Sequence, residues 1–385
     1  MPATTPSGFH ALPVTILQLS LDTVLKSGQS FRWLSYPMNS SAGPDEPKYE
    51  HRFCLRDRVI CLQQSSTALY YKTLFPVQTT LEQTASLESQ TLPWIKDYFQ
   101  LDVDLSQLYD QWATADPVFR RFRHRFPGVR ILRQDPWENL ISFICSSNNN
   151  ISRITSMVNN LCAHYTPPLL SAGIPASSEL QAYHPFSPPS ALTGKEVPAT
   201  LRSLGFGYRA GFIHRTAQIL CDAHPAQDLT CEAGAVEPPE RWLMTLREAE
   251  TASAREELLK FVGVGRKVAD CVLLMSLDKR EVVPVDTHVH QIAVKHYGVR
   301  STSKKTMTPK LYDEVNEKLA GIWGEYAGWA HTVLFTADLK SFSAHDLSAA
   351  ALEASVPPES PKKRTRETAD DGNGEQTTSS KRSKR

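Results

Sequence analysis

The sequence predicts an α+β protein, in which an N-terminal antiparallel β-sheet domain is followed by an all-helical region and a disordered basic tail. Two observations lead to this prediction. Residues 50–75 alternate apolar and polar side chains, which is typical of half-buried strands. From about residue 91 the apolar side chains recur at helical spacing. We place the sheet domain at 8–130, the helical region at 131–345 and the tail at 346–385.

The strands are expected in two runs. HRFCLRDRVICLQQ alternates with a break near Asp57 and Arg58, and ALYYKTLF then resumes with aromatic and apolar residues. A polar break between two alternating runs is typical of a hairpin turn. Neighbouring strands joined in this way predict an antiparallel sheet.

Three aspartates predict helix starts. Asp104 precedes LSQLYDQWA, and Asp116-Pro117 places a capping residue before proline at the first helical position. Asp135-Pro136 repeats this pattern, and Glu138 stands at the third helical position, as in a capping box. Helical patterning returns at 209–221 and continues to about 340.

Two stretches lack helical patterning. Residues 166–200 contain seven prolines among Ser and Ala, which predicts an irregular connection. Residues 346–385 are rich in Pro, Ser, Thr and charge, and contain the basic clusters 362–366 and 381–385. These clusters favour nuclear import, with a mitochondrial share left open. The alternative is a tail that only solubilises the chain or binds nucleic acid weakly.

Composition excludes several classes of protein. Hydrophobic residues make up 41% and charged residues 22% of the 385 residues, as in globular proteins. No apolar run approaches the roughly 18 residues of a membrane-spanning helix, so we expect no membrane partner. The seven cysteines form no CxxC pair, which argues for reduced thiols and against a zinc or iron–sulfur site. We therefore expect no metal.

Charge is unevenly distributed along the chain. The net charge is +1, but residues 361–385 carry eight Lys/Arg and four Asp/Glu, so residues 1–360 sum to −3. A folded part with this charge needs a local basic patch to bind nucleic acid. RRFRHRFPGVRILR at 120–133 has six Arg, one His and no acid. It is either a phosphate-facing patch or a solvated helix face.

The stretch 256–290 contains the pattern that is most informative about function. One helical run ends at Phe261, Gly263 and Gly265 follow in VGVG, and a second run begins near Lys267. This pattern predicts a helix–hairpin–helix, in which free N–H groups at the second helix suit a DNA phosphate. A plain turn between two helices is the alternative.

VGVGRKVAD and VPVDTHVH resemble the helix–hairpin–helix, Gly/Pro-rich, Asp (HhH-GPD) superfamily of DNA glycosylases. The resemblance implies that Lys267 is an amine nucleophile and that Asp286 stabilises the positive charge that develops on the sugar. A Lys at this position marks the bifunctional branch, which excises a base and then nicks the strand. The alternatives are a solvated Lys267 and an Asp286 that only caps the helix THVHQIAVKHY.

Four further segments resemble the 8-oxoguanine DNA glycosylases: GQSFRW at 28–33, the run at 130–155 that contains CSSNNN, LGFGYRA at 204–210, and WGEYAGWAHTVLFTADL at 323–339. The resemblance implies excision of 8-oxoguanine opposite cytosine, β-elimination at the abasic site, no cofactor, and damaged double-stranded DNA as partner. We expect a monomer. Other hypotheses are a glycosylase for another damaged purine and a non-catalytic DNA-binding module.

The resemblance also implies a lesion pocket. The Gly28 carbonyl would accept the N7–H that distinguishes 8-oxoguanine from guanine. Cys271 and Phe335 would cover the two faces of the base, and Met275 would line the pocket. His331 stands where the family usually has Gln. A neutral histidine offers one donor and one acceptor, and its charge can change near neutral pH, so the bonding pattern and pH dependence stay open.

The remaining residues that match the family are implied to contact the DNA outside the lesion base. Asn148 would enter the space left by the flipped nucleotide, and Tyr208 would intercalate as a wedge. Arg153 and Arg209 would hold the orphaned cytosine. His288 would contact a phosphate, with Asp338 as its partner.

Overall fold

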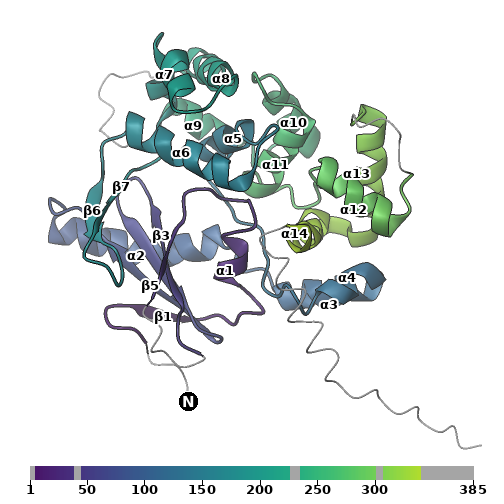
Figure 1. Cartoon of the computed structure of the whole chain (residues 1–385), viewed down its shortest axis with the longest axis horizontal. Coiled ribbons are helices and arrows are strands. Elements are labelled where there is room, and N and C mark those ends of the chain that lie inside the picture. Colours follow the sequence, from purple (N-terminus) through teal and green to yellow (C-terminus); the bar gives the residue numbers. More distant parts are fainter. Residues whose placement is uncertain (1–4, 39–44, 226–234, 301–306, 340–385) are drawn as a thin grey trace, which may run out of the picture.

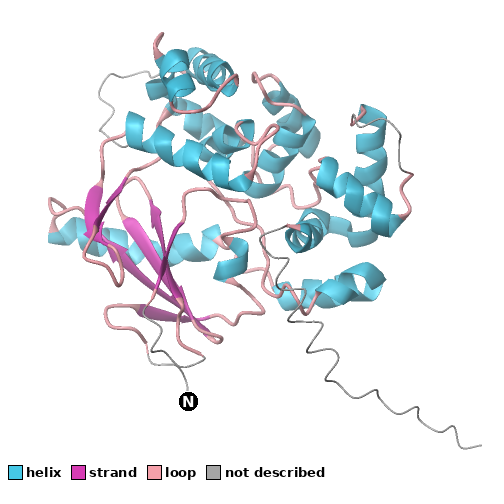
Figure 2. Cartoon of the chain, viewed as in Figure 1, coloured by secondary structure: helices cyan, strands magenta, loops and turns pink. Residues whose placement is uncertain are grey.

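The fold is an antiparallel sheet followed by a helical region, as predicted. The computed structural model describes residues 5–38, 45–225, 235–300 and 307–339. In Figures 1 and 2 the sheet lies at the lower left, and helices make up the upper and right-hand parts. The predicted tail at 346–385, with both of its basic clusters, lies outside the described residues.

Five strands form the sheet in the order β1-β5-β4-β3-β2, and each neighbouring pair is antiparallel. The predicted run at 50–75 supplies three of them. The strands are β1 (His10–Pro13), β2 (Leu34–Pro37), β3 (Tyr49–Cys54), β4 (Val59–Gln64) and β5 (Ala68–Leu74). Helix α2 (Leu81–Tyr98) packs on one face of the sheet, and this core includes the buried residues Trp33, Phe53, Ile60, Leu62, Ile95 and Phe99.

The helical region surrounds α5, whose residues are all buried. The helices besides α2 are α1 (Leu21–Val24), α3 (Leu105–Ala115), α4 (Pro117–Phe122), α5 (Pro136–Ile144), α6 (Ile151–Tyr165), α7 (Val197–Ser203), α8 (Arg209–Ala223), α9 (Pro238–Thr245), α10 (Thr251–Leu259), α11 (Arg266–Ser276), α12 (Thr287–Tyr297), α13 (Pro309–Trp323) and α14 (Ala327–Asp338). Within the described part of the chain, none of them has the length and hydropathy that a membrane-spanning segment requires.

The predicted helix caps are present, with one correction. Asp104, Asp116 and Asp135 each accept a hydrogen bond from a backbone N–H in the first turn of the helix that follows. The prediction of a capping box at Asp135 was wrong in its second half. The Glu138 carboxylate does not return to the cap, because it forms a bidentate ion pair with Arg32 at 3.0 and 2.7 Å.

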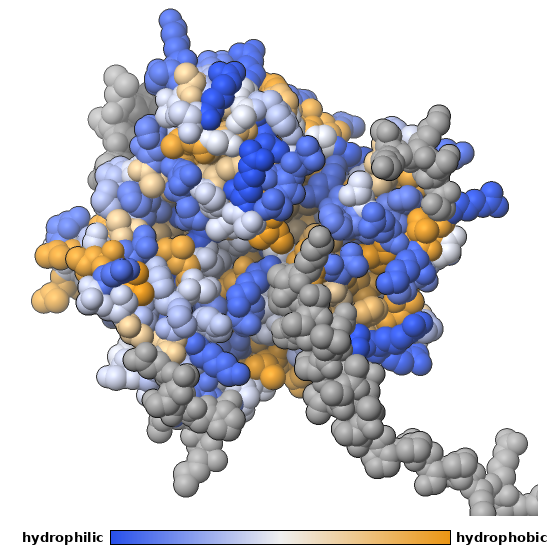
Figure 3. Space-filling model, viewed as in Figure 1, coloured by the Kyte–Doolittle hydropathy of each residue, from blue (hydrophilic) through white to orange (hydrophobic). Residues whose placement is uncertain are grey.

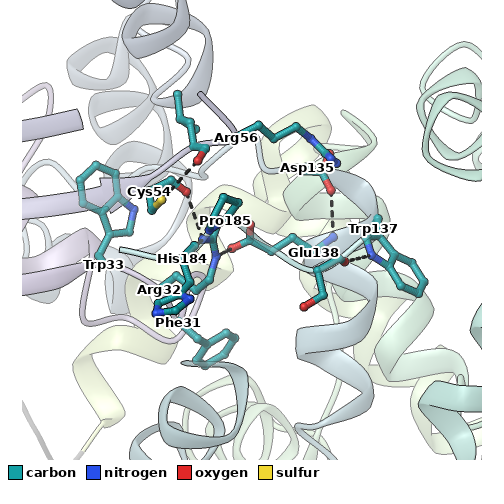
Figure 4. A network of polar contacts seen from close by, with 12 residues as sticks. Phe31, Arg32, Trp33, Cys54, Arg56, Asp135, Trp137, Glu138, His184 and Pro185 are labelled. Carbon is teal, nitrogen blue, oxygen red and sulfur yellow. Dashed lines mark hydrogen bonds and ion pairs between the residues drawn. The ribbon is translucent and has the colours of Figure 1, made fainter. Parts of the chain in front are cut away.

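Arg32 and Glu138 fasten the sheet domain to the helical region (Figure 4). Nη1 of Arg32 also donates to the carbonyls of Cys54 at 3.0 Å and His184 at 3.2 Å. The guanidinium lies 4.6 Å from the centre of the Phe53 ring. One buried side chain thus joins segments from three distant parts of the sequence.

The proline-rich stretch 166–200 is more regular than predicted. It contains a β-hairpin, β6 (Leu170–Gly173) and β7 (Leu180–Tyr183), then a 3₁₀ turn at Pro189–Leu192 and helix α7. The hairpin covers the face of the sheet opposite α2, where Tyr183 packs with Cys54, Val59 and Cys61. Its prolines lie outside the two strands, so they break no ladder hydrogen bond.

Candidate active site

A cavity of about 700 Å³ opens where the loop before β2, the α5–α6 turn, and helices α11, α12 and α14 meet. Such a volume is within the usual range of small-molecule sites. Eight of the predicted site residues line it, although they come from positions up to 307 apart in the sequence. They are Gly28, Lys267, Cys271, Met275, Asp286, His288, His331 and Phe335.

Helix α11 presents three of these side chains at one wall. Gly265 is its N-terminal cap, and Lys267 follows as the second helical residue. Cys271 and Met275 lie one and two turns further along, so all three share one face of the helix. Nζ of Lys267 lies 5.0 Å from the centre of the Phe143 ring, which is part of the cavity wall.

Asp286 lines the same cavity as the N-cap of α12. Its Oδ1 accepts hydrogen bonds from the backbone N–H groups of His288 at 2.9 Å and Val289 at 3.0 Å. Capping was the structural alternative to catalysis, and the structure confirms this role for Asp286. The carboxylate still lines the cavity, and its side chain is 26% exposed.

Two titratable side chains of the cavity wall, His331 and Cys271, are uncharged. Burial lowers the pKa of His331 to about 4 and raises the pKa of the Cys271 thiol to about 11, so both side chains are neutral near pH 7. The His331 and Phe335 rings lie 6.0 Å apart. Neither ring nitrogen of His331 has a well-oriented hydrogen-bond partner within the described ranges. A buried polar group without a partner is available to a ligand.

Gly28 lines the cavity from the N-terminal domain, in a conformation that few other residues adopt. Its φ is +81°, and an added Cβ would lie 2.9 Å from Cδ1 of Ile151. The next residue, Gln29, is buried and bonds to the backbone on both sides of Ile131: its Nε2 donates to the Arg130 carbonyl, and its Oε1 accepts from Leu132 N–H, both at 3.0 Å. These contacts fix the backbone at Gly28.

The four predicted orphan-base and wedge residues form a separate cluster beside the cavity. Tyr208 Oη donates to the Ser147 carbonyl at 3.1 Å, and Arg209 Nη2 donates to that of Asn148 at 3.2 Å. Arg153 Nη2 donates to the Gly205 carbonyl at 3.3 Å. Tyr208 is 53% exposed, as an intercalating side chain requires, whereas Arg209 is buried.

The predicted hairpin lies between α10 and α11. Gly263 has a φ of +83°, and a Cβ there would meet the Phe212 ring at 2.5 Å. Only glycine therefore allows this turn to pack on α8. Gly265 is exposed at the start of α11, and His288 is 59% exposed at the start of α12. Both helix N-termini are accessible to a phosphate.

Comparisons with known proteins agree with this arrangement. Residues 11–140 match the family model described as 8-oxoguanine DNA glycosylase, N-terminal domain, and residues 141–318 match that of the HhH-GPD superfamily base excision DNA repair protein. The N-glycosylase/DNA lyase of Saccharomyces cerevisiae is 35% identical, with 86% of each chain covered. The N-glycosylase/DNA lyase OGG1 of Arabidopsis thaliana is also 35% identical, covering 87% of this chain and 81% of its own.

The chain belongs to the 8-oxoguanine DNA glycosylase family. It is thereby a base-excision DNA repair enzyme of the bifunctional glycosylase and lyase type. Its fold is shared with the Clostridium acetobutylicum 8-oxoguanine glycosylase/lyase, with a TM-score of 0.65, 22% identity, and 86% of this chain and 97% of that one covered. The 3-methyladenine DNA glycosylase of Archaeoglobus fulgidus, at 16% identity and 87% and 99% coverage, also gives a TM-score of 0.57. The fold alone therefore does not decide the lesion.

This glycosylase contains a support behind Asp286 that the sequence did not reveal. The buried Asp270 carboxylate accepts from Tyr312 Oη at 2.5 Å and from Arg255 Nε at 2.7 Å. The same Tyr312 oxygen accepts from the Val285 N–H at 3.1 Å. The residue before Asp286 is thus tied to α11 and α13. A charged residue in the otherwise apolar interior of VADCVLLM was the one signal that could have pointed to Asp270.

Proposed function

We propose that this enzyme excises 8-oxoguanine paired with cytosine, with Lys267 as the nucleophile. The observation that carries the proposal is that Lys267 and Asp286 line one cavity together with the neutral His331 side chain and the Phe335 ring. An amine and a carboxylate beside a base-sized pocket suit the cleavage of an N-glycosidic bond. The 8-oxoguanine named in the family model and in the Clostridium relative supports this lesion.

The reaction proceeds in two stages. The neutral Lys267 amine attacks C1′ of the flipped nucleotide, and the C1′–N9 electron pair leaves with the base, which takes up a proton. The Asp286 carboxylate stabilises the positive charge that develops on the sugar. Ring opening gives a Schiff base between Nζ and C1′. Loss of a C2′ proton then expels the 3′ phosphate by β-elimination, and hydrolysis of the Schiff base frees Lys267.

Recognition of the lesion rests on the pocket walls. The Gly28 carbonyl accepts a hydrogen bond from N7–H, which 8-oxoguanine carries and guanine lacks. In normal guanine N7 is itself an acceptor, so it would face the carbonyl oxygen without a hydrogen between them. Cys271 and Phe335 cover the faces of the base, and Met275 fills the remaining wall. The neutral His331 ring supplies one hydrogen bond to the Watson–Crick edge. This role is supported by the burial of the ring and by the lack of a well-oriented partner for its nitrogens among the described residues.

The neighbouring cluster serves the other strand. Asn148 fills the vacated space, Tyr208 unstacks the duplex as a wedge, and Arg153 and Arg209 donate to O2 and N3 of the orphaned cytosine. The backbone at Gly263 and Gly265, together with His288, binds phosphates. Damaged double-stranded DNA is the partner, and the enzyme acts as a monomer in the nucleus. The basic clusters of the tail support nuclear import.

Borohydride trapping tests the proposal. Wild-type protein is mixed with duplexes that carry 8-oxoguanine opposite C or opposite A, and borohydride reduces any Schiff base to a stable adduct. We expect an adduct with the C-paired lesion only, lost in Lys267→Gln. The matched control is Lys260→Gln, at an exposed lysine seven residues upstream that pairs with Glu257. Release of the free base without an adduct would overturn the amine mechanism. The absence of both free base and adduct would overturn the proposed activity.

A further inference from the structure

The arginine-rich stretch 120–133 divides into two groups in the structure. Arg130 is buried and donates to the carbonyls of Gln18 at 2.7 Å and Phe99 at 2.8 Å, among others. Arg133 pairs with Asp97 and Asp278. These two arginines hold the fold together. The arginines at 120, 121, 123 and 125 lie in or directly after α4.

Helix α4 meets α12 and α14 at a groove of about 240 Å³, which Arg125, Lys295 and Asp338 help to line. The Phe122 and His296 rings also line it, with their centres 6.3 Å apart in an edge-to-face arrangement. Burial is the largest cause that lowers the pKa of His296, and the positive charges of Lys295 and Arg121 lower it further. Both charges therefore lie near this ring. We call Arg121 and Lys295 the α4–α12 patch.

Within the described ranges, the nearby acids form no ion pair with either residue of this patch. Asp110 pairs with Arg123 at 2.5 Å, outside the patch. Asp116 is buried, where its Oδ2 accepts from Tyr297 Oη at 2.7 Å and Trp323 Nε1 at 3.0 Å. Asp338 is the exposed acid at the edge of the groove. Neither Arg121 nor Lys295 forms an ion pair with another residue of the described ranges, and both are exposed. In Figure 3 the lower right edge, where α3 and α4 lie in Figure 1, is largely hydrophilic.

The groove beside the patch adjoins the proposed catalytic cavity. Asp338 lines both the cavity and the groove. Helix α12 runs between them, with His288 at the cavity and Lys295 at the patch. Seven helical residues span about 10 Å. One strand of B-DNA advances about 3.4 Å per nucleotide, so this distance corresponds to about three nucleotides.

We propose that the α4–α12 patch binds the phosphate backbone of the lesion strand about three nucleotides beyond the flipped base. The inference rests on the proposed DNA substrate and adds a contact outside the hairpin, the wedge and the lesion pocket. Guanidinium and ammonium groups suit phosphates and read no base sequence. The contact anchors the duplex on the side of the cavity opposite the α10–α11 hairpin.

The first measurement is the salt dependence of DNA binding. The variant Arg121→Gln/Lys295→Gln removes two charges from the patch, and Lys48→Gln/Lys96→Gln removes two exposed charges from the N-terminal domain. Each lost phosphate contact reduces the slope of log K against log salt by about 0.9, so we expect a reduction of about 2 for the patch variant. The control should keep the wild-type slope. Equal slopes for both variants would overturn the proposal.

A second measurement locates the contact. Single methylphosphonates, which are uncharged, replace phosphates one at a time on both sides of the lesion. Wild-type protein should lose affinity at a position about three nucleotides from the lesion on one side, and the patch variant should show no further loss there. Loss at that position in both proteins would refute the patch. Excision of 8-oxoguanine by wild-type protein is scored on the same duplexes, so a failure of the proposed function is seen separately from a failure of the patch.

Discussion

His331 offers the sharpest test of the electrostatics of the site. The side chain is 6% exposed, and burial holds its pKa at about 4, below the ordinary value of 6.5. The unfolded chain therefore binds a proton at a higher pH than the folded enzyme does. The contribution of neutral His331 to stability is complete above pH 6.5 and is lost as the pH falls from 6.5 to 4. Replacement by Gln removes this titration and keeps a polar side chain of similar length.

The expected size follows from the two pKa values. At pH 5, linkage between a folded pKa of about 4 and an unfolded pKa of 6.5 gives a loss of about 2 kcal/mol relative to pH 7. Below pH 4 the loss levels off at about 3 kcal/mol. His331→Gln should therefore show a shallower acid limb than wild type, by about 2 kcal/mol at pH 5. Other titrating groups, such as the buried His51, contribute equally to both proteins.

Urea unfolding at pH 7 and pH 5 measures this difference. The exposed His124 provides the matched control variant, His124→Gln, which should follow the wild-type acid limb. An NMR titration of the His331 ring gives the folded pKa directly. A ring pKa above 6, or parallel acid limbs for wild type and His331→Gln, would refute the reasoning. The same low pKa predicts that the His331 ring stays neutral between pH 6 and 8, so its part in lesion recognition should not vary over this range.

Three further substitutions follow from the packing. Arg32→Met leaves the Glu138 carboxylate buried without its partner and should destabilise the protein by about 3–5 kcal/mol in urea unfolding, with part of the loss recovered when Glu138→Gln is added; a loss below 1 kcal/mol would contradict this. Gly28→Ala places a Cβ against Ile151 at a positive φ and should lower the free energy of unfolding by about 1–3 kcal/mol. We also expect a lower kcat/KM, and a wild-type kcat/KM would contradict this prediction. Tyr312→Phe removes a buried hydroxyl with two partners and should cost about 1–3 kcal/mol and slow single-turnover excision; unchanged excision would exclude a positioning role.

The features that the sequence predicted best are those decided within a few residues. Asp104 and Asp116 cap their helices through N–H groups two or three positions away. Gly263 is required by the turn itself, because a positive φ is a local property. Lys267, Cys271 and Met275 share a cavity wall because helical spacing places them on one face.

Features that depend on distant partners were missed. Glu138 stands where a capping box would place it, but an arginine 106 residues earlier in the chain takes its carboxylate. The 166–200 stretch has the composition of a loop, yet the exposed face of the sheet provides a surface on which a short hairpin folds. The Arg121 and Arg130 side chains belong to one basic run, and only tertiary packing separates the surface residue from the buried one. Local composition carries no information about any of these partners.

Asp286 shows how one carboxylate serves both structure and chemistry. Its Oδ1 caps α12 through His288 and Val289, and Tyr312 fixes the preceding Val285, so the side chain is held on both sides. Oδ2 forms no hydrogen bond with the part of the chain that the structure describes, and the side chain borders the cavity. Capping therefore orients the carboxylate without neutralising its charge.

Asp286→Asn should separate the two roles, because asparagine caps as well as aspartate but carries no charge. We expect unfolding free energy within about 0.5 kcal/mol of wild type and base excision slowed about a hundredfold or more. Asp286→Ala should lose about 1 kcal/mol in addition. Wild-type excision by Asp286→Asn would mean that the carboxylate is a cap and nothing else.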